Sequence, residues 1–259
     1  MKRILILIFP LIFVACGTLN TEKLLSAGVN LATSYTITDE QVAAMCTEYI
    51  VYQDQQSTIA AADSPYTVRL NNLVSKIKGA ESLNLNFKVY HTDEINAFAC
   101  GDGSIRIYSG LMDVMTDEEV FAVIGHEIGH LKNSDTKNMM IQAYKTAAIK
   151  DAIGAINTKL EKLTSSQLAA IATAYSEAQF SQTQEFAADN MAFNICLESG
   201  FGPYAMYNAL TKLVELAGGA DSNQGIAAKV AQMFSTHPDS ATRAAKMKQT
   251  ADNYVANNR

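Results

Sequence analysis

The sequence has no tryptophan and only four prolines, four histidines and four cysteines among its 259 residues, and its 26 acidic side chains outnumber its 20 basic ones. A net charge of −6 leaves no broad cationic surface, which argues against nucleic-acid binding through phosphate neutralisation. Glycine and proline are too scarce for a collagen-like chain, and no sequence repeat recurs, which excludes a solenoid. The hydrophobic fraction of 48% indicates one large globular domain or two small ones.

The first fifteen residues have the pattern of an export signal. Lys2 and Arg3 precede an apolar run over residues 4–15 that Pro10 interrupts. Twelve helical residues rise about 18 Å, well short of the roughly 30 Å of a bilayer core, so this run predicts a cleaved signal peptide and not a lasting span. No later run reaches the length of a spanning helix.

The signal ends at Cys16, which follows small residues and resembles the lipobox of bacterial lipoproteins. That resemblance implies a lipidated Cys16 as the mature N-terminus, a tether over residues 16–37 and a stable anchor through several acyl chains. Gly17 follows the cysteine, and the resemblance then implies the outer membrane, with the domain facing the periplasm. An ordinary secretory signal with an incidental cysteine is the alternative.

The remainder predicts an α+β fold that is mainly helical, with a small β-sheet beside one central helix. Capping-box patterns begin helices at Thr38 and Thr116, and Ser64-Pro65 begins another. The pattern extends the first helix to about residue 62, ends the second at Gly79 and gives one long helix from about 165 to 198. Alternating apolar residues predict strands over 83–89 and 104–108.

The strongest chemical motif is His-Glu-Ile-Gly-His at residues 126–130, on the helix that begins near Thr116. Histidines four residues apart lie on one helix face, so His126 and His130 can bind a single tetrahedral Zn²⁺. Glu127 lies beside them, where its carboxylate can act as a general base toward a zinc-activated water. Two surface histidines beside a helix-favouring glutamate are the alternative interpretation.

The spacing of two acidic residues indicates Glu185 as the third ligand. Glu185 and Asp189 are four residues apart and therefore share a helix face. Two histidines and one glutamate form the ligand set of catalytic zinc hydrolases, which leave the fourth position open for water. Asp189 is then placed to accept the second ring N–H of a ligand histidine.

Together these residues resemble the glutamate-zincin peptidase family of the HtpX heat-shock protease and the CAAX-prenyl protease, in particular its soluble, LoiP-like lipoprotein branch. The resemblance covers most of the chain after residue 38 and implies a zincin-like metallopeptidase domain over residues 38–252. The segments that carry it are 95–98, 105–112, 123–130, 180–189 and Thr-His-Pro at 236–238 with Arg243. The chain lacks the spanning helices of the membrane-embedded members, so processing of prenylated peptides is not implied.

The resemblance implies one Zn²⁺ per chain on His126, His130 and Glu185, with Glu127 as the base. It also implies that Asn96 contacts the substrate backbone, and that His237 and Arg243 face the cleft and help hold the substrate or the oxyanion. Two of these have an ordinary alternative: Asn96 as a turn residue, and His237 as the cap of a helix that starts near residue 239. The strand 104–108 could accept an extended peptide if it lies at a sheet edge, or could be purely structural.

Three cysteines remain when Cys16 is set aside, an odd number that allows one disulfide and one free thiol. A disulfide between Cys46 and Cys100 is the preferred pair, because it would tie the first helix to the loop beside the active site. Cys196 lies among apolar helical residues and is expected to be a buried thiol, whereas a metal role for Cys100 stays open. His91 lies outside every motif and is expected to be structural.

The sequence therefore predicts a zinc-dependent endopeptidase that is lipid-anchored to the outer membrane and hydrolyses unfolded or misassembled envelope proteins. Its expected partners are extended polypeptides and the membrane, with other envelope proteins as further candidates. The rival hypothesis is an envelope chaperone or assembly factor that keeps the protease fold and binds clients without catalysis. Residues 131–164 could cover the cleft as a lid or pack away from it.

Overall fold

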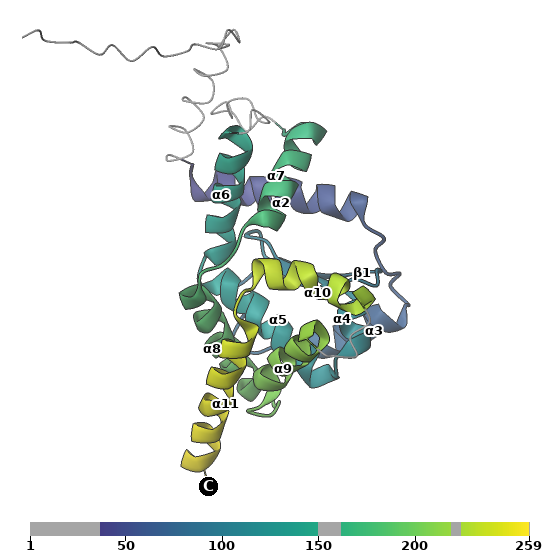
Figure 1. Ribbon diagram of the computed structural model, residues 1–259. Helices are drawn as coiled ribbons and strands as arrows, with labels where there is room; N and C mark the ends of the chain where they lie inside the picture. Colours follow the sequence, from purple (N-terminus) through teal and green to yellow (C-terminus); the bar gives the residue numbers. More distant parts are fainter. Residues whose placement is uncertain (1–36, 150–161, 219–223, 259) are drawn as a thin grey trace, which may run out of the picture.

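The computed structural model describes residues 37–149, 162–218 and 224–258, and the predicted signal peptide, Cys16 and tether lie outside this part of the chain. The fold is α+β and mainly helical, as predicted (Figure 1). Its elements are α2 (Asp39–Gln56), α3 (Pro65–Val74), β1 (Asn86–Tyr90), β2 (Ala97–Ala99), β3 (Ser104–Tyr108), α4 (Ser109–Val114), α5 (Asp117–Lys132), α6 (Asp135–Ile149), α7 (Ser165–Glu177), α8 (Gln182–Glu198), α9 (Ala205–Gly218), α10 (Gln224–Thr236) and α11 (Ser240–Asn257).

The three strands form one sheet in the order β1-β3-β2, with β3 parallel to β1 and antiparallel to β2. A tight turn joins β2 to β3: Gly103, at φ +92°, donates its N–H to the Cys100 carbonyl oxygen. Strand 104–108 was predicted correctly, but it is the central strand. Its proposed role as a peptide-binding edge is therefore wrong, because both of its sides are already paired.

The predicted helix starts at Thr38, Ser64 and Thr116 are confirmed, and each of these residues accepts a backbone N–H through its hydroxyl. The helix ends differ. Helix α2 stops at Gln56 because the following residues pair with β1, as in the bridge between Ile59 and Tyr90. Helix α3 stops at Val74, before Gly79.

The single helix expected over 165–198 is two helices, α7 and α8. Ala178 has an extended backbone, and Ser181 begins α8 through a capping box with Gln184. The break lets α7 and α8 take different directions from the turn that joins them (Figure 1). The residues of α7 therefore pack with α2 and α6, whereas those of α8 pack against α5.

Helix α5 lies at the centre of the fold, with α2, α6 and α7 on one side and α8, α9 and α11 on the other (Figure 1). Its apolar residues belong to the larger of two hydrophobic clusters, which also includes the sheet, α8 and α9. The second cluster joins α2, α6 and α7. Among the helices described, none is long and apolar enough to cross a membrane.

Candidate active site

Helix α5 carries His126, Glu127 and His130, and all three side chains are at most 2% exposed. Its first turn is fixed by a capping box in which the Thr116 N–H donates to Glu119 Oε2 at 2.8 Å. The Nε2 atoms of the two histidines lie 3.0 Å apart. The predicted one-face arrangement is thus present in the interior of the fold.

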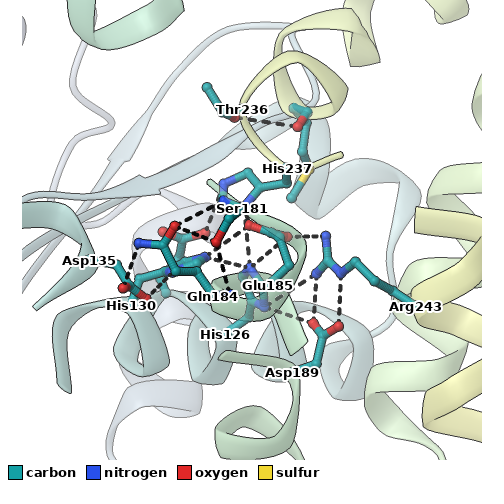
Figure 2. A network of polar contacts seen from close by, with 12 residues as sticks. His126, His130, Asp135, Ser181, Gln184, Glu185, Asp189, Thr236, His237 and Arg243 are labelled. Carbon is teal, nitrogen blue, oxygen red and sulfur yellow. Dashed lines mark hydrogen bonds and ion pairs between the residues drawn. The ribbon is translucent and has the colours of Figure 1, made fainter. Parts of the chain in front are cut away.

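Glu185 reaches the histidines from α8 because two glycines let the helices pack closely. A Cβ atom on Gly129 would lie 2.8 Å from Ala188 Cα, and one on Gly125 would lie 3.1 Å from Ala192 Cα. Glu185 is fully buried, with Oε1 3.3 Å from His130 Nε2 and Oε2 3.7 Å from His126 Nε2. The structure therefore brings together the three residues expected to bind a metal (Figure 2).

His237 is a fourth possible donor, which sequence reasoning had placed only near the cleft. Its Nδ1 atom lies 3.0 Å from Glu185 Oε1 and 3.3 Å from His126 Nε2. One ligand atom from each of the four residues fits within a 4.8 Å cluster. The alternative role of His237 as a helix cap is not seen: the N-cap residue of α11 is Asp239, with no side-chain cap bond, and the His237 imidazole contacts Glu185 and His126 instead.

The donor set fits a tetrahedral metal ion. Ligand atoms at about 2.0–2.1 Å from a tetrahedral ion are roughly 3.3 Å from each other. The nitrogen and oxygen donors of His126, His130 and Glu185 are 3.0–3.7 Å apart. Beside them, Glu127 Oε1 is buried with no hydrogen-bond partner among the described residues, which leaves this carboxylate oxygen free to accept a proton.

Asp189 and Arg243 lie beside His126 and Glu185 (Figure 2). Asp189 Oδ1 is 2.9 Å from His126 Nδ1, the contact that the sequence predicted. Arg243 donates to both Asp189 oxygens, at 2.6 and 2.8 Å, and also contacts the Glu185 carboxylate. Arg243 does not line the cavity that Glu127 and His237 face: its guanidinium is enclosed by two carboxylates, the residue is 2% exposed, and it lines a separate small cavity with His126 and His237.

Asp135 was missed by the sequence argument and makes the matching contact to the other histidine. Its Oδ2 lies 3.0 Å from His130 Nδ1, and its Oδ1 accepts a hydrogen bond from Gln184 Nε2 at 2.8 Å. Ser134, in the left-handed region at φ 60°, turns the chain from α5 into α6 and places Asp135 there. The Nδ1 atom of each α5 histidine thus has its own carboxylate partner.

Burial and these contacts set the protonation of the site. Burial lowers the pKa of His126 to about 4, although the Asp189 contact works in the opposite direction. Burial also opposes the charge of His130, but its contacts with Asp135 and Glu185 raise its pKa to about 9. Burial raises the pKa of the Glu127 carboxyl above its ordinary value, as suits a general base that must later release its proton.

Glu127 and His237 face a cavity of about 210 Å³. Asn96 also lines it, is 6% exposed and accepts the Ala97 N–H through Oδ1 at 2.9 Å. The remaining lining residues come from several elements and are mostly aromatic or apolar: Tyr49, Gln53, Glu94, Phe98, Ala99, Tyr108, Met139, Tyr175, Ser176, Phe180, Gln232 and Thr236. The described part of segment 131–164 packs against α2 and α7 and forms one wall through Met139.

The cysteine prediction is corrected. Cys46, Cys100 and Cys196 are buried free thiols, so the expected disulfide between Cys46 and Cys100 is absent from the described part of the chain. The two residues are neighbours, but Cys100 Sγ faces the Cys46 carbonyl oxygen at 3.9 Å. No cysteine belongs to the donor cluster of the described residues, and burial raises the pKa of Cys196 to about 12.

Two histidines one helical turn apart, a glutamate from a neighbouring helix and a buried glutamate at a cavity place the chain among the metalloproteases of the His-Glu-x-x-His type. Within that class the chain belongs to peptidase family M48, whose model matches residues 69–251. The predicted LoiP-like branch of the glutamate-zincins is thereby confirmed.

Three relatives show how far the similarity extends. The chain is 35% identical to the metalloprotease LoiP of Escherichia coli K12 over 234 residues, which cover 90% of this chain and 89% of LoiP. It is 30% identical to the E. coli metalloprotease YcaL, over 87% of this chain and 86% of YcaL. A beta-barrel assembly-enhancing protease of Yersinia pestis is 28% identical over 90% of this chain but only 49% of its own length.

Proposed function

We propose that this metalloprotease is a zinc-dependent endopeptidase with a catalytic domain over residues 38–252, and that it hydrolyses unfolded or misassembled envelope proteins. The observation that carries the proposal is the donor set. His126, His130 and Glu185 converge at 3.0–3.7 Å beside a buried Glu127 oxygen that accepts no hydrogen bond from the described residues. Nitrogen and oxygen donors in this number suit Zn²⁺.

Zinc bound by these three residues would polarise the scissile carbonyl and acidify the attacking water. Glu127 then accepts a proton from that water and delivers it to the leaving amine, a role that its raised pKa supports. Asp189 and Asp135 keep the Nδ1 atoms of the histidines engaged, so that both Nε2 atoms stay directed at the metal position. His237 Nε2, 3.7 Å from Glu127 Oε1, is placed to donate to the developing oxyanion.

The shape of the site supports an extended substrate. Glu127 is 1% exposed and is reached through the cavity, so a peptide bond has to enter on a flexible segment and not on the surface of a folded domain. Asn96, on the same cavity wall, is placed to hydrogen-bond the backbone of such a segment. These features favour unfolded or loop regions as substrates.

The base assignment is tested by Glu127→Gln. Because Glu127 is not among the donors, the variant should bind zinc as the wild type does and lose peptide cleavage by at least about a hundredfold, the usual contribution of general-base catalysis. Zinc content and cleavage of unfolded casein are measured in parallel. Undiminished cleavage would overturn the assignment, and Glu185→Gln should instead release the metal.

A second candidate, an assembly factor that works without hydrolysis, is favoured by one observation. A relative bears the name beta-barrel assembly-enhancing protease, which joins the two activities. The Glu127→Gln variant separates them in cells. If it restores the assembly of outer-membrane proteins in a deletion strain, binding suffices; if it fails while retaining zinc, hydrolysis is required.

We further propose that lipid on Cys16 anchors the enzyme to the outer membrane, with the domain in the periplasm. The proposal rests on the lipobox-like sequence that ends at Cys16 and on Gly17 after it. A Cys16→Ser variant is expected to leave the outer-membrane fraction. Labelling with a palmitate analogue should occur in the wild type alone, and equal labelling of both proteins would contradict the anchor.

A further inference from the structure

An exposed carboxylate, that of Glu94, lines the catalytic cavity. Glu94 is exposed and lines the same cavity as Glu127, but no hydrogen bond or ion pair of its carboxylate is found among the described residues. Its neighbour Asp93 differs, because Lys229 Nζ lies 2.6 Å from Asp93 Oδ2. Within the part of the chain that the structure describes, Asp93 is therefore paired with a cation and Glu94 is not.

Glu94 also joins the catalytic cavity to a second one. This second cavity, of about 310 Å³, is lined by Glu94 and Tyr108, which both cavities share, and by Gln56, Ser57, Thr58, Tyr90, His91 and Thr92. Its hydroxyls and carboxamide offer hydrogen-bond acceptors. Burial and the nearby Glu94 charge raise the pKa of Tyr108 to about 12, so this phenol stays neutral beside the carboxylate at physiological pH.

Charge complementarity identifies the side chain that fits this place. No lysine or arginine lines either cavity in the part of the chain that the structure describes. The ammonium of lysine and the guanidinium of arginine are hydrogen-bond donors and carry no acceptor. A lysine or arginine in the substrate would therefore be matched by the Glu94 carboxylate and by several oxygen acceptors. An acidic side chain would meet a like charge.

We propose that Glu94 forms a specificity subsite that selects substrates with a lysine or arginine close to the scissile bond. The inference rests on the proposed peptidase function and names a charged side chain of the substrate that Glu94, on the wall of the catalytic cavity, would recognise. An ion pair of this exposed kind corresponds to about a two- to fivefold difference in kcat/KM. The preference should weaken as ionic strength rises, because exposed charges are screened.

The test uses quenched fluorescent peptides that share one sequence and carry Lys, Gln or Glu at a single position, moved through three positions on each side of the scissile bond. The wild type should favour Lys over Glu at one position by about two- to fivefold. Glu94→Gln should abolish that ratio, and Glu94→Lys should reverse it. Glu81→Gln is the control, since it removes an exposed glutamate that lines neither cavity and should leave the ratio unchanged.

The outcomes separate this inference from the function on which it rests. Cleavage with no charge preference at any position overturns the subsite and leaves the peptidase intact, as does a preference that survives in Glu94→Gln. If no peptide is cleaved by the wild type, the proposed peptidase function fails and the subsite fails with it. A reversed preference in Glu94→Lys supports the subsite, because a general loss of activity cannot invert a ratio.

Discussion

Asp135 is the residue whose role the structure defines most sharply beyond the motif itself. It lies 3.0 Å from His130 Nδ1, is 5% exposed and is held in turn by Gln184. Loss of such a partner typically lowers metal affinity by about 10- to 100-fold. Asp135→Ala should weaken zinc binding by that amount, whereas Asp135→Asn, which keeps an acceptor oxygen, should lose less. Competition with a chromogenic chelator measures the affinity, and equal affinities in all three proteins would contradict the role.

The relative positions of site residues within one helix were predictable from the sequence. Contacts between distant segments were not. His126 and His130 share a face because of helix geometry alone, and the prediction needed no tertiary information. Asp135 has no such local signal: its approach to His130 depends on the left-handed turn at Ser134. The place of Arg243 was inferred from the family resemblance, and its spacing from His237 does not reveal that two buried carboxylates enclose it.

Among the elements, the pairing of α5 with α8 decides whether the donors meet. A Cβ atom at Gly129 would lie 2.8 Å from backbone Cα of Ala188, closer than real Cβ contacts come, so Gly129→Ala must push the helices apart. We expect a loss of about 1–3 kcal/mol in unfolding free energy, as for other overpacked interiors, together with weaker zinc binding. Urea denaturation and zinc titration measure the two effects.

Gly125→Ala provides a graded comparison on the same helix. Its Cβ atom would lie 3.1 Å from Ala192 Cα, a less severe approach, so both effects should be smaller than at Gly129. If the two variants lose equal stability and affinity, close packing at Gly129 is not what positions Glu185. The comparison also excludes a simple helix-propensity effect, because alanine favours the helix at both positions.

Helix starts were predicted better than helix ends because the two have different causes. A start depends on local capping, as at Thr116 with Glu119, and is visible in four consecutive residues. The end of α2 depends on the pairing of Ile59 with Tyr90, which comes from the other side of the fold. The missed break before α8 is an exception, since Ser181 and Gln184 form a capping box that the surrounding apolar pattern concealed.

At the scale of the whole molecule, the proposed metal ligands come from two separate segments, and a third segment places His237 beside them. His126 and His130 come from α5, Glu185 from α8 and His237 from the turn between α10 and α11. In the unfolded chain these segments are far apart, so zinc binds the native state in strong preference. Binding of this kind stabilises a protein by RT ln(1 + [L]/Kd), about 4 kcal/mol when free zinc is a thousandfold above Kd.

Chelation should therefore lower the melting temperature, and zinc should restore it. For a domain of this size, about 4 kcal/mol corresponds to a shift of roughly 10 °C, which calorimetry or fluorimetry of the EDTA-treated and reloaded protein would measure. Glu127→Gln should show the full shift, because Glu127 is not a donor, and Glu185→Gln should show little. A shift of the same size in Glu185→Gln would mean that zinc stabilises the fold from another place, since the proposed link between α5 and α8 through the metal would have been removed.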